Sequence, residues 1–220
     1  SEVANSVVST SVFANPEAYG DFTALDADRS SWLRGFSDRI LADERVKGRM
    51  LDVGCAKVPH ELLRRIFERA TQVDGVDPQE RMKLNPTLTE KWLGLIEDID
   101  EIPEAAYDTA LAFLVAEHLE DPTPFMRAVN RAMQPGAVFY ATTPNGKHPF
   151  PMAVRMVEAL GLKDRLASQT DNINDYPAYY RMNTQEQVTR VVRGLADEGT
   201  VFDEIEFMYY PCVQWDTFVP

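Results

Sequence analysis

Two short apolar runs constrain the fold of this chain more than any other feature. Each ends in a residue of a type that α/β sheets use to bind a ligand at the ends of their strands. The first, residues 49–55, turns at Gly54, and the second, residues 73–77, ends at Asp77. A strand, a glycine turn, a helix and a second strand ending in an acid form the nucleoside-binding unit of α/β sheets. The glycine lets backbone N–H groups approach a ligand, and the acid accepts hydrogen bonds from ribose hydroxyls. The pair therefore predicts an α/β fold with a nucleoside site at one sheet edge.

Further apolar runs continue this pattern along the chain. They predict strands at residues 49–53, 72–77, 107–115, 137–143 and 201–210. The continuous apolar character of most runs is typical of a parallel sheet covered by helices on both faces. Only the last run alternates with acids, so we expect it near an edge of the sheet.

Helical signals fall between these runs. An apolar residue at every fourth position from Trp32 to Ile40 predicts an amphipathic helix. Thr123 is expected to begin another helix, because it precedes a proline and an apolar stripe. Thr184 and Gln187 have the spacing of a capping box at the start of a later helix.

Composition excludes several classes of function. A net charge of −13 and a pI near 4.7 argue against nucleic-acid binding, which needs clustered Lys and Arg. No apolar run is long enough to span a membrane. The two cysteines, Cys55 and Cys212, form no disulfide framework, and no Cys/His spacing indicates a metal site. We therefore expect a cytoplasmic protein that binds neither metal, membrane nor nucleic acid.

Three motifs lie in the order expected of one family. Residues 51–55 read LDVGC, residues 117–122 read EHLEDP and residues 133–145 read MQPGAVFYATTPN. The chain thereby resembles the class I S-adenosylmethionine-dependent methyltransferases, in particular the small-molecule branch, whose motifs read LDVGCGxG, EHL.DP and L.PGG......PN. The resemblance implies a Rossmann-like sheet of about seven mostly parallel strands with helices on both faces. It also implies S-adenosylmethionine as cofactor, S-adenosylhomocysteine as product and a small-molecule acceptor.

The resemblance fails at the glycine loop. Where the family has Gly-Cys-Gly-x-Gly, this chain continues from Gly54 and Cys55 into Ala56, Lys57 and Val58. The added side chains at Ala56 and Val58 narrow the approach of a ligand to the backbone. Lys57 is either a solvated loop residue or a partner for the cofactor's carboxylate. The alternative function is therefore a non-catalytic methyltransferase-like subunit with a degenerate cofactor loop.

The resemblance implies a cofactor site along the carboxyl edge of the sheet. Its expected members are Asp52, Gly54, Cys55, Ala56, Asp77, Pro78, Asp98, Ile99, Phe113, Leu114 and Tyr19. Asp77 would bind the ribose, with a turn cap as the alternative role. Asp98 matches the family's adenine contact, or else belongs to a solvated acidic run. Phe113 and Leu114 resemble the wall beside the methionine moiety, or else are core. Tyr19 resembles an aromatic that closes over the cofactor, with packing of the N-terminal arm as the alternative.

The acceptor side is expected around His118. A histidine titrates near neutral pH and can remove a proton from a hydroxyl nucleophile, although a structural role is the alternative. Asn145 and His148 follow the fifth-strand motif and either contact an acceptor or are loop residues. Tyr179 and Tyr180 resemble a family segment that folds over the acceptor. They would otherwise bury a subunit interface, which leaves room for a homodimer.

We expect one methyltransferase-like domain over residues 1–220, because the sequence contains neither repeats nor a low-complexity linker. An N-terminal arm and helix would occupy residues 1–45. Residues 46–145 would form the cofactor-binding half, and residues 146–220 the acceptor-side half.

Overall fold

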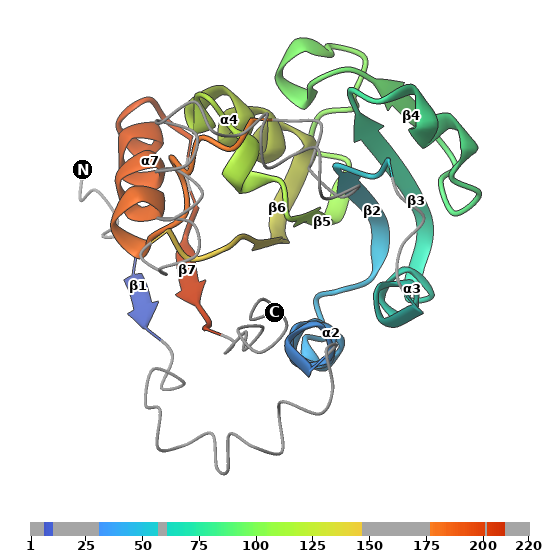
Figure 1. Ribbon diagram of the computed structural model, residues 1–220, viewed down its shortest axis with the longest axis horizontal. Helices are drawn as coiled ribbons and strands as arrows, with labels where there is room; N and C mark the ends of the chain where they lie inside the picture. The colour runs from blue at the N-terminus through green and yellow to red at the C-terminus, as the bar shows by residue number, and fades with distance from the viewer. Residues whose placement is uncertain (1–6, 11–30, 57–60, 147–176, 201, 210–220) are drawn as a thin grey trace, which may run out of the picture.

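The centre of the protein is a parallel sheet (Figure 1). The computed structural model describes residues 7–10, 31–56, 61–146, 177–200 and 202–209. Five strands pair in the order β4-β3-β2-β5-β6, all parallel. Their bounds are β2 (Gly48–Val53), β3 (Ala70–Asp77), β4 (Lys91–Leu93), β5 (Tyr107–Phe113) and β6 (Met133–Thr142). The predicted α/β fold with a mostly parallel sheet is confirmed.

Helices cover both faces of this sheet (Figure 1). On one face α2 (Ser31–Ala42) packs beside α3 (Glu61–Phe67), and on the other α4 (Pro122–Ala132) packs beside α7 (Gln185–Asp197). Three 3₁₀ helices follow β3, β4 and β5: η3 (Glu80–Leu84), η4 (Ile96–Asp98) and η5 (Ala116–His118). In the part of the chain that the structure describes, no helix is long and apolar enough to cross a membrane.

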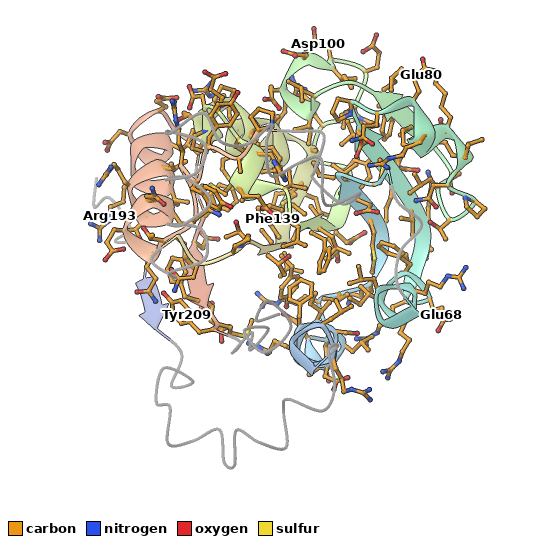
Figure 2. All side chains as sticks on the ribbon, in the orientation of Figure 1. Glu68, Glu80, Asp100, Phe139, Arg193 and Tyr209 are labelled. Carbon is orange, nitrogen blue, oxygen red and sulfur yellow. The ribbon has the colours of Figure 1, made fainter. Side chains whose placement is uncertain are left out.

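Strand β2 shows why the central strands need continuous apolar runs. Met50 belongs to the core cluster beside α2 and α3, whereas its neighbour Leu51 belongs to the cluster beside α4 and α7. Both side chains are fully buried, because successive side chains of a strand point to opposite faces. In Figure 2 the Glu80 and Asp100 side chains point outward, whereas Phe139 of β6 is half-buried against the core.

The predicted helix starts are confirmed with one correction. The hydroxyl of Thr184 accepts the N–H of Gln187 at 3.3 Å, which is one half of a capping box, while Oε1 of Gln187 accepts the N–H of Asn183 at 2.9 Å. The start predicted at Thr123 is wrong by one residue, because α4 begins at Pro122. Asp121 is the cap and accepts the N–H of Thr123 at 2.9 Å. A proline suits the first helical position, since the N–H that it lacks would have no helical partner.

The last strand lies outside the main sheet. β7 (Glu204–Phe207) pairs in parallel with β1 (Val7–Thr10) in a separate two-stranded sheet. Within the described residues the main sheet therefore has five strands, not about seven. Ile205 and Phe207 are half-buried, whereas Glu204 and Glu206, which alternate with them, are exposed, and this confirms the alternation. A strand with one apolar face does not suit a sheet buried on both sides.

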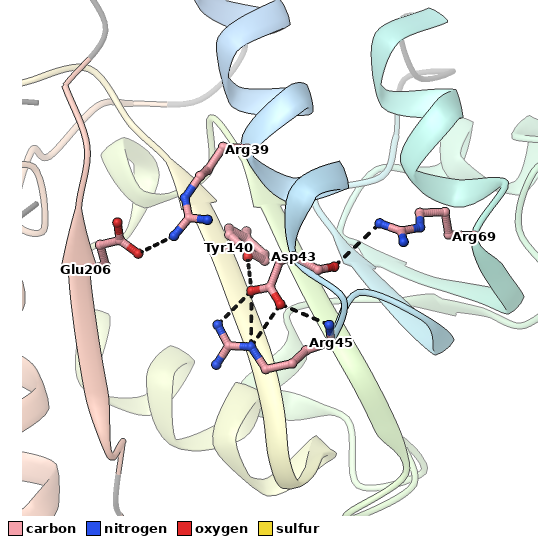
Figure 3. A network of polar contacts seen from close by, with 6 residues as sticks. All are labelled: Arg39, Asp43, Arg45, Arg69, Tyr140 and Glu206. Carbon is pink, nitrogen blue, oxygen red and sulfur yellow. Dashed lines mark hydrogen bonds and ion pairs between the residues drawn. The ribbon is translucent and has the colours of Figure 1, made fainter.

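A polar network fastens α2 to β6 and β7 (Figure 3). Asp43, which follows α2, accepts hydrogen bonds from Nη2 of Arg45 at 2.6 Å and from the Tyr140 hydroxyl at 2.7 Å. Arg39 of α2 forms an ion pair with Glu206 of β7 at 2.7 Å. Hydrogen bonding from Arg45 holds the pKa of Asp43 well below its ordinary value. The network thus joins the small sheet and α2 to the main sheet.

Candidate functional site

The carboxyl ends of the parallel strands bring several loops together at one edge of the sheet. Gly54 begins the loop after β2 with a φ of +84°, a conformation that favours glycine. Its N–H donates to the carbonyl of Val76 at 2.9 Å. A Cβ at this position would lie 2.4 Å from Cγ2 of Val115. Backbone conformation and packing against the loop after β5 therefore both require glycine here.

Asp77 closes β3 and is buried at this edge. Its Oδ2 accepts the backbone N–H of Ala56 at 3.0 Å, and its Oδ1 accepts the N–H of Gln79 at 2.7 Å across the exposed Pro78. The second bond is the turn cap that the sequence offered as an alternative role. A carboxylate has about four lone-pair sites, so about two are left for a ligand. Capping and ribose binding are therefore compatible at Asp77.

Asp52 is a second buried carboxylate at the same edge. Burial raises its pKa to about 7, and the charge of Asp77 adds to the effect. Asp52 lines a cavity of about 10 Å³ together with Phe36 and Phe113. Such a volume holds no more than one water molecule. A larger ligand would therefore lie across the sheet edge, where two neighbouring carboxylates favour positive charge.

Cys55 and Leu114 face in different directions. The Cys55 side chain is buried, and its Sγ would lie 2.6 Å from a Cβ added to Gly75 of β3. Burial raises the pKa of this thiol, and the Cys55 carbonyl accepts Nδ2 of Asn85 at 3.0 Å. Cys55 therefore holds the loop after β2 in place through contacts on its buried side. Leu114 is 38% exposed with a φ of +56°, so it ends β5 with its side chain partly in solvent.

Asp98 and Ile99 lie at the end of η4. Asp98 is exposed, and Ile99 is half-buried against the core. Their loop joins the end of β3, because the N–H of Gly94 donates to the carbonyl of Asp77 at 3.0 Å. The structure thus places both residues on the side of Asp77 away from β2.

Glu117 and His118 form an acid–base pair after β5. Glu117 is 5% exposed, and its Oε1 lies 4.0 Å from Nε2 of His118. Its Oε2 is 3.2 Å from the hydroxyl of Thr143, and burial raises its pKa. Nδ1 of His118 lies 2.9 Å from the carbonyl oxygen of Pro177. A buried acid beside a histidine at the functional edge of a sheet is a candidate catalytic group.

The structure brings Tyr179 and Tyr180 to this pair, and their role toward an acceptor stays a prediction. Their backbone N–H groups donate to the carbonyl of Glu117 at 2.7 and 3.1 Å. Tyr180 is buried and has a φ of +52°, which is uncommon for a bulky residue. His118 therefore lies against the segment that carries both tyrosines.

Asn145 is exposed at the same edge, beside Gly146. The N–H of Gly146 donates to the carbonyl of Asn183 at 2.8 Å, so the loop after β6 is also joined to this segment. Tyr19 and His148 lie outside the described residues, and their roles stay predictions.

Sequence reasoning singles out His118 and misses three neighbours, Glu117, Thr143 and Asn183. Glu117 stands in the same EHL motif, which is the signal that would have found it. Thr143 and Asn183 are 40 positions apart, and nothing local indicates that their side chains bond. Over the described residues, no group of three or more His, Cys, Asp or Glu is placed to hold a metal ion.

Comparison with known proteins agrees with this geometry. A family model described as a methyltransferase domain matches residues 25–182. No curated protein sequence gives a match. A solved structure from Bacillus halodurans, described as a methyltransferase, is 14% identical over 76% of this chain and 68% of that chain, with a TM-score of 0.50. This likeness supports the fold.

A solved S-adenosylmethionine-dependent methyltransferase from Mesorhizobium loti is 25% identical, with a TM-score of 0.42. The match covers 55% of each chain, so this chain spans about half the length of that relative. The family model covers well over half of the present sequence. The chain therefore belongs to the methyltransferase domain family.

Proposed function

We propose that this protein transfers a methyl group from S-adenosylmethionine to a small-molecule acceptor. The observation that carries the proposal is Asp77, a buried carboxylate at the end of β3 with lone-pair sites left over, next to the glycine turn at Gly54. Membership in the methyltransferase domain family supports the same proposal. The residues fit the cofactor, because ribose hydroxyls need acceptors and a cationic sulfonium needs nearby negative charge.

Each element of the edge has a defined task in this proposal. S-adenosylmethionine supplies a methyl group on a positively charged sulfur, so most of the chemistry belongs to the cofactor. Asp77 binds the ribose, and Asp52 contributes the negative charge. Phe113 lies beside the methionine moiety of the cofactor, and Asp98 and Ile99 lie toward its adenine. The protein then acts chiefly by orienting two reactants.

The acceptor side comprises His118, Asn145, Tyr179 and Tyr180. A small molecule is favoured because a net charge of −13 disfavours a nucleic-acid acceptor. His118, which lies between a buried acid and a backbone carbonyl, is the group suited to remove a proton. The acidic composition and two cysteines support a cytoplasmic setting, and a homodimer that buries the tyrosine segment is a further proposal, testable by light scattering.

A non-catalytic subunit is the second candidate, and the side chain of Ala56 supports it. The backbone N–H of Ala56 donates to Asp77, so residue 56 lies beside the carboxylate proposed to bind the ribose. A Cβ at this position, where the resembled family has glycine, narrows the space for a ribose. The two candidates differ in a single measurable property, which is affinity for the cofactor.

Calorimetry with S-adenosylmethionine and S-adenosylhomocysteine tests the proposal. We expect binding by the parent and weakening by about 1–3 kcal/mol in Asp77→Asn, which loses charge-assisted hydrogen bonds. The matched control is Asp203→Asn, which changes an exposed acid that follows α7 in the sequence. Absence of binding by the parent would support the non-catalytic subunit, and parental affinity in Asp77→Asn would remove Asp77 from the site.

A further inference from the structure

A hollow of about 350 Å³ lies between the start of α4 and the first turns of α7. Small-molecule sites have volumes of this order. Four charged side chains line the hollow: Glu120 and Asp121 from the loop before α4, Arg181 from the segment before α7, and Arg190 from α7 itself. The hollow therefore presents two negative and two positive groups to a ligand.

These opposite charges are not paired with one another. Among the residues that the structure describes, no ion pair joins Arg181 or Arg190 to a carboxylate. Other arginines of this acidic chain do form such pairs: Arg49 lies 2.7 Å from Asp74, and Arg39 lies 2.7 Å from Glu206. The guanidinium groups of the hollow therefore keep donors available for a ligand.

Arg181 is held in place by contacts that leave most of its donors available. Its Nη1 donates to the backbone carbonyl of Glu120 at 2.7 Å, and its Cζ lies 5.8 Å from the centre of the Tyr179 ring. The hydrogen bond uses one of the five N–H groups of a guanidinium, and the ring contact uses none. A planar guanidinium fixed in this way suits a carboxylate, which it can meet with two parallel hydrogen bonds.

Asp121 is a carboxylate of the same hollow that is also held in place. Its Oδ1 accepts the N–H of Thr123 at 2.9 Å as the cap of α4. The start of this helix offers few N–H donors to an anion, because Pro122 and Pro124 have none and that of Thr123 is bound to the cap. The α4 side of the hollow therefore suits an ammonium group better than an anion.

We propose that this hollow binds a small zwitterion of the amino acid class, whose carboxylate meets Arg181 and Arg190 and whose ammonium group meets Asp121. A singly charged anion would be repelled by the two acids, and a singly charged cation by the two arginines. A zwitterion places each of its charges beside groups of opposite sign. The site goes beyond the proposed methyl transfer and does not depend on it, because its four charged side chains are separate from the residues proposed for cofactor and acceptor.

Four five-carbon probes test the charge requirement: norvaline, δ-aminovalerate, valerate and pentylammonium. Each would be titrated near neutral pH into the full chain without cofactor, while the arginine Nε–H signals are followed by nitrogen-15 NMR. We expect one of the two zwitterions to bind at least about tenfold more tightly than either singly charged probe. The preferred zwitterion then reports how far apart the site holds the two charges. If neither zwitterion is preferred by that margin, or if no probe binds, the proposal is overturned.

Matched variants locate the binding. Asp121→Asn removes the negative charge and keeps an oxygen that can cap α4, so the helix start is retained. This variant and Arg190→Gln should each weaken binding of the preferred zwitterion about tenfold. The controls are Arg193→Gln and Asp197→Asn, which change exposed side chains of α7 outside the hollow and should bind the zwitterion as the parent does. Parental affinity in Asp121→Asn or in Arg190→Gln, or an equal loss in the controls, refutes the site.

Discussion

The backbone N–H of Ala56 donates to Oδ2 of Asp77 across 3.0 Å, so the altered loop is tied to the same acid that closes β3. The bond uses the main chain, and any residue at position 56 would keep it. What Ala56 adds is a Cβ on a surface that the family leaves bare.

The first prediction follows from that Cβ. Ala56→Gly should tighten binding of S-adenosylhomocysteine and lower the free energy of unfolding by about 0.5–1 kcal/mol through added backbone entropy. Calorimetry and denaturant unfolding measure the two effects. The double change Ala56→Gly with Val58→Gly, whose second position lies outside the described residues, should tighten binding further. Weaker binding in both variants would mean that the loop has a working geometry of its own.

The second prediction concerns Asp52 and pH. Its pKa is raised from 3.8 to about 7 in the folded protein, so folding favours its protonated form. Stability from this group is complete below pH 4 and is lost as pH rises to 7, with about 4 kcal/mol as an upper bound. Asp52→Asn should therefore stabilise the ligand-free protein more at pH 8 than at pH 5. Equal stabilisation at both pH values would show that Asp52 ionises normally.

The third prediction couples the same group to ligand binding. A cationic ligand favours the ionised carboxylate, so S-adenosylmethionine should release a proton from Asp52 when it binds below pH 7. Calorimetry in two buffers of different ionisation enthalpy detects this proton. Asp52→Asn should abolish the buffer dependence, and a parent without buffer dependence at pH 6 would contradict the coupling.

The fourth prediction tests the network at Asp43. Tyr140→Phe removes a 2.7 Å hydrogen bond to a buried carboxylate and should cost about 1–3 kcal/mol of stability. Because the pKa of Asp43 is lowered in the folded state, this carboxylate stabilises the protein above its unfolded pKa of 3.8 and less as pH falls. Glu206→Gln, at a more exposed ion pair, is the control and should cost under about 1 kcal/mol. If urea unfolding shows the same loss of unfolding free energy in both variants, the hydrogen bond from Tyr140 to Asp43 contributes no more than the exposed ion pair.

The fifth prediction concerns catalysis by His118. Once an acceptor with a proton-bearing nucleophile is identified, His118→Gln should lower turnover about tenfold or more. Cofactor affinity should stay near that of the parent, since His118 lies on the acceptor side. Parental turnover in the variant would return His118 to a structural role.

Local sequence was enough to locate most of the fold. The apolar runs predict β2, β3, β5 and β6 because each strand must be buried on both faces. Their ends are less certain: β5 stops at Phe113 because Leu114 takes a positive φ, and β6 begins at Met133, before its apolar run. The three-residue β4 is too short for a periodic signal. β7 shows the alternation of an edge strand. Its pairing with β1 joins segments almost 200 positions apart, so no local signal predicts it.

The same distinction between local sequence and tertiary packing applies to the candidate site. Sequence alone determined Gly54, Asp77 and the EHL motif, because turns, strand ends and motifs are written in neighbouring residues. Only the tertiary structure decided which way the polar groups of the acceptor side point. His118 meets Pro177 across 59 positions, and Thr143 meets Glu117 across 26. The carbonyl of Pro177 decides which ring nitrogen of His118 carries a proton, and that information exists only when the two segments are packed together.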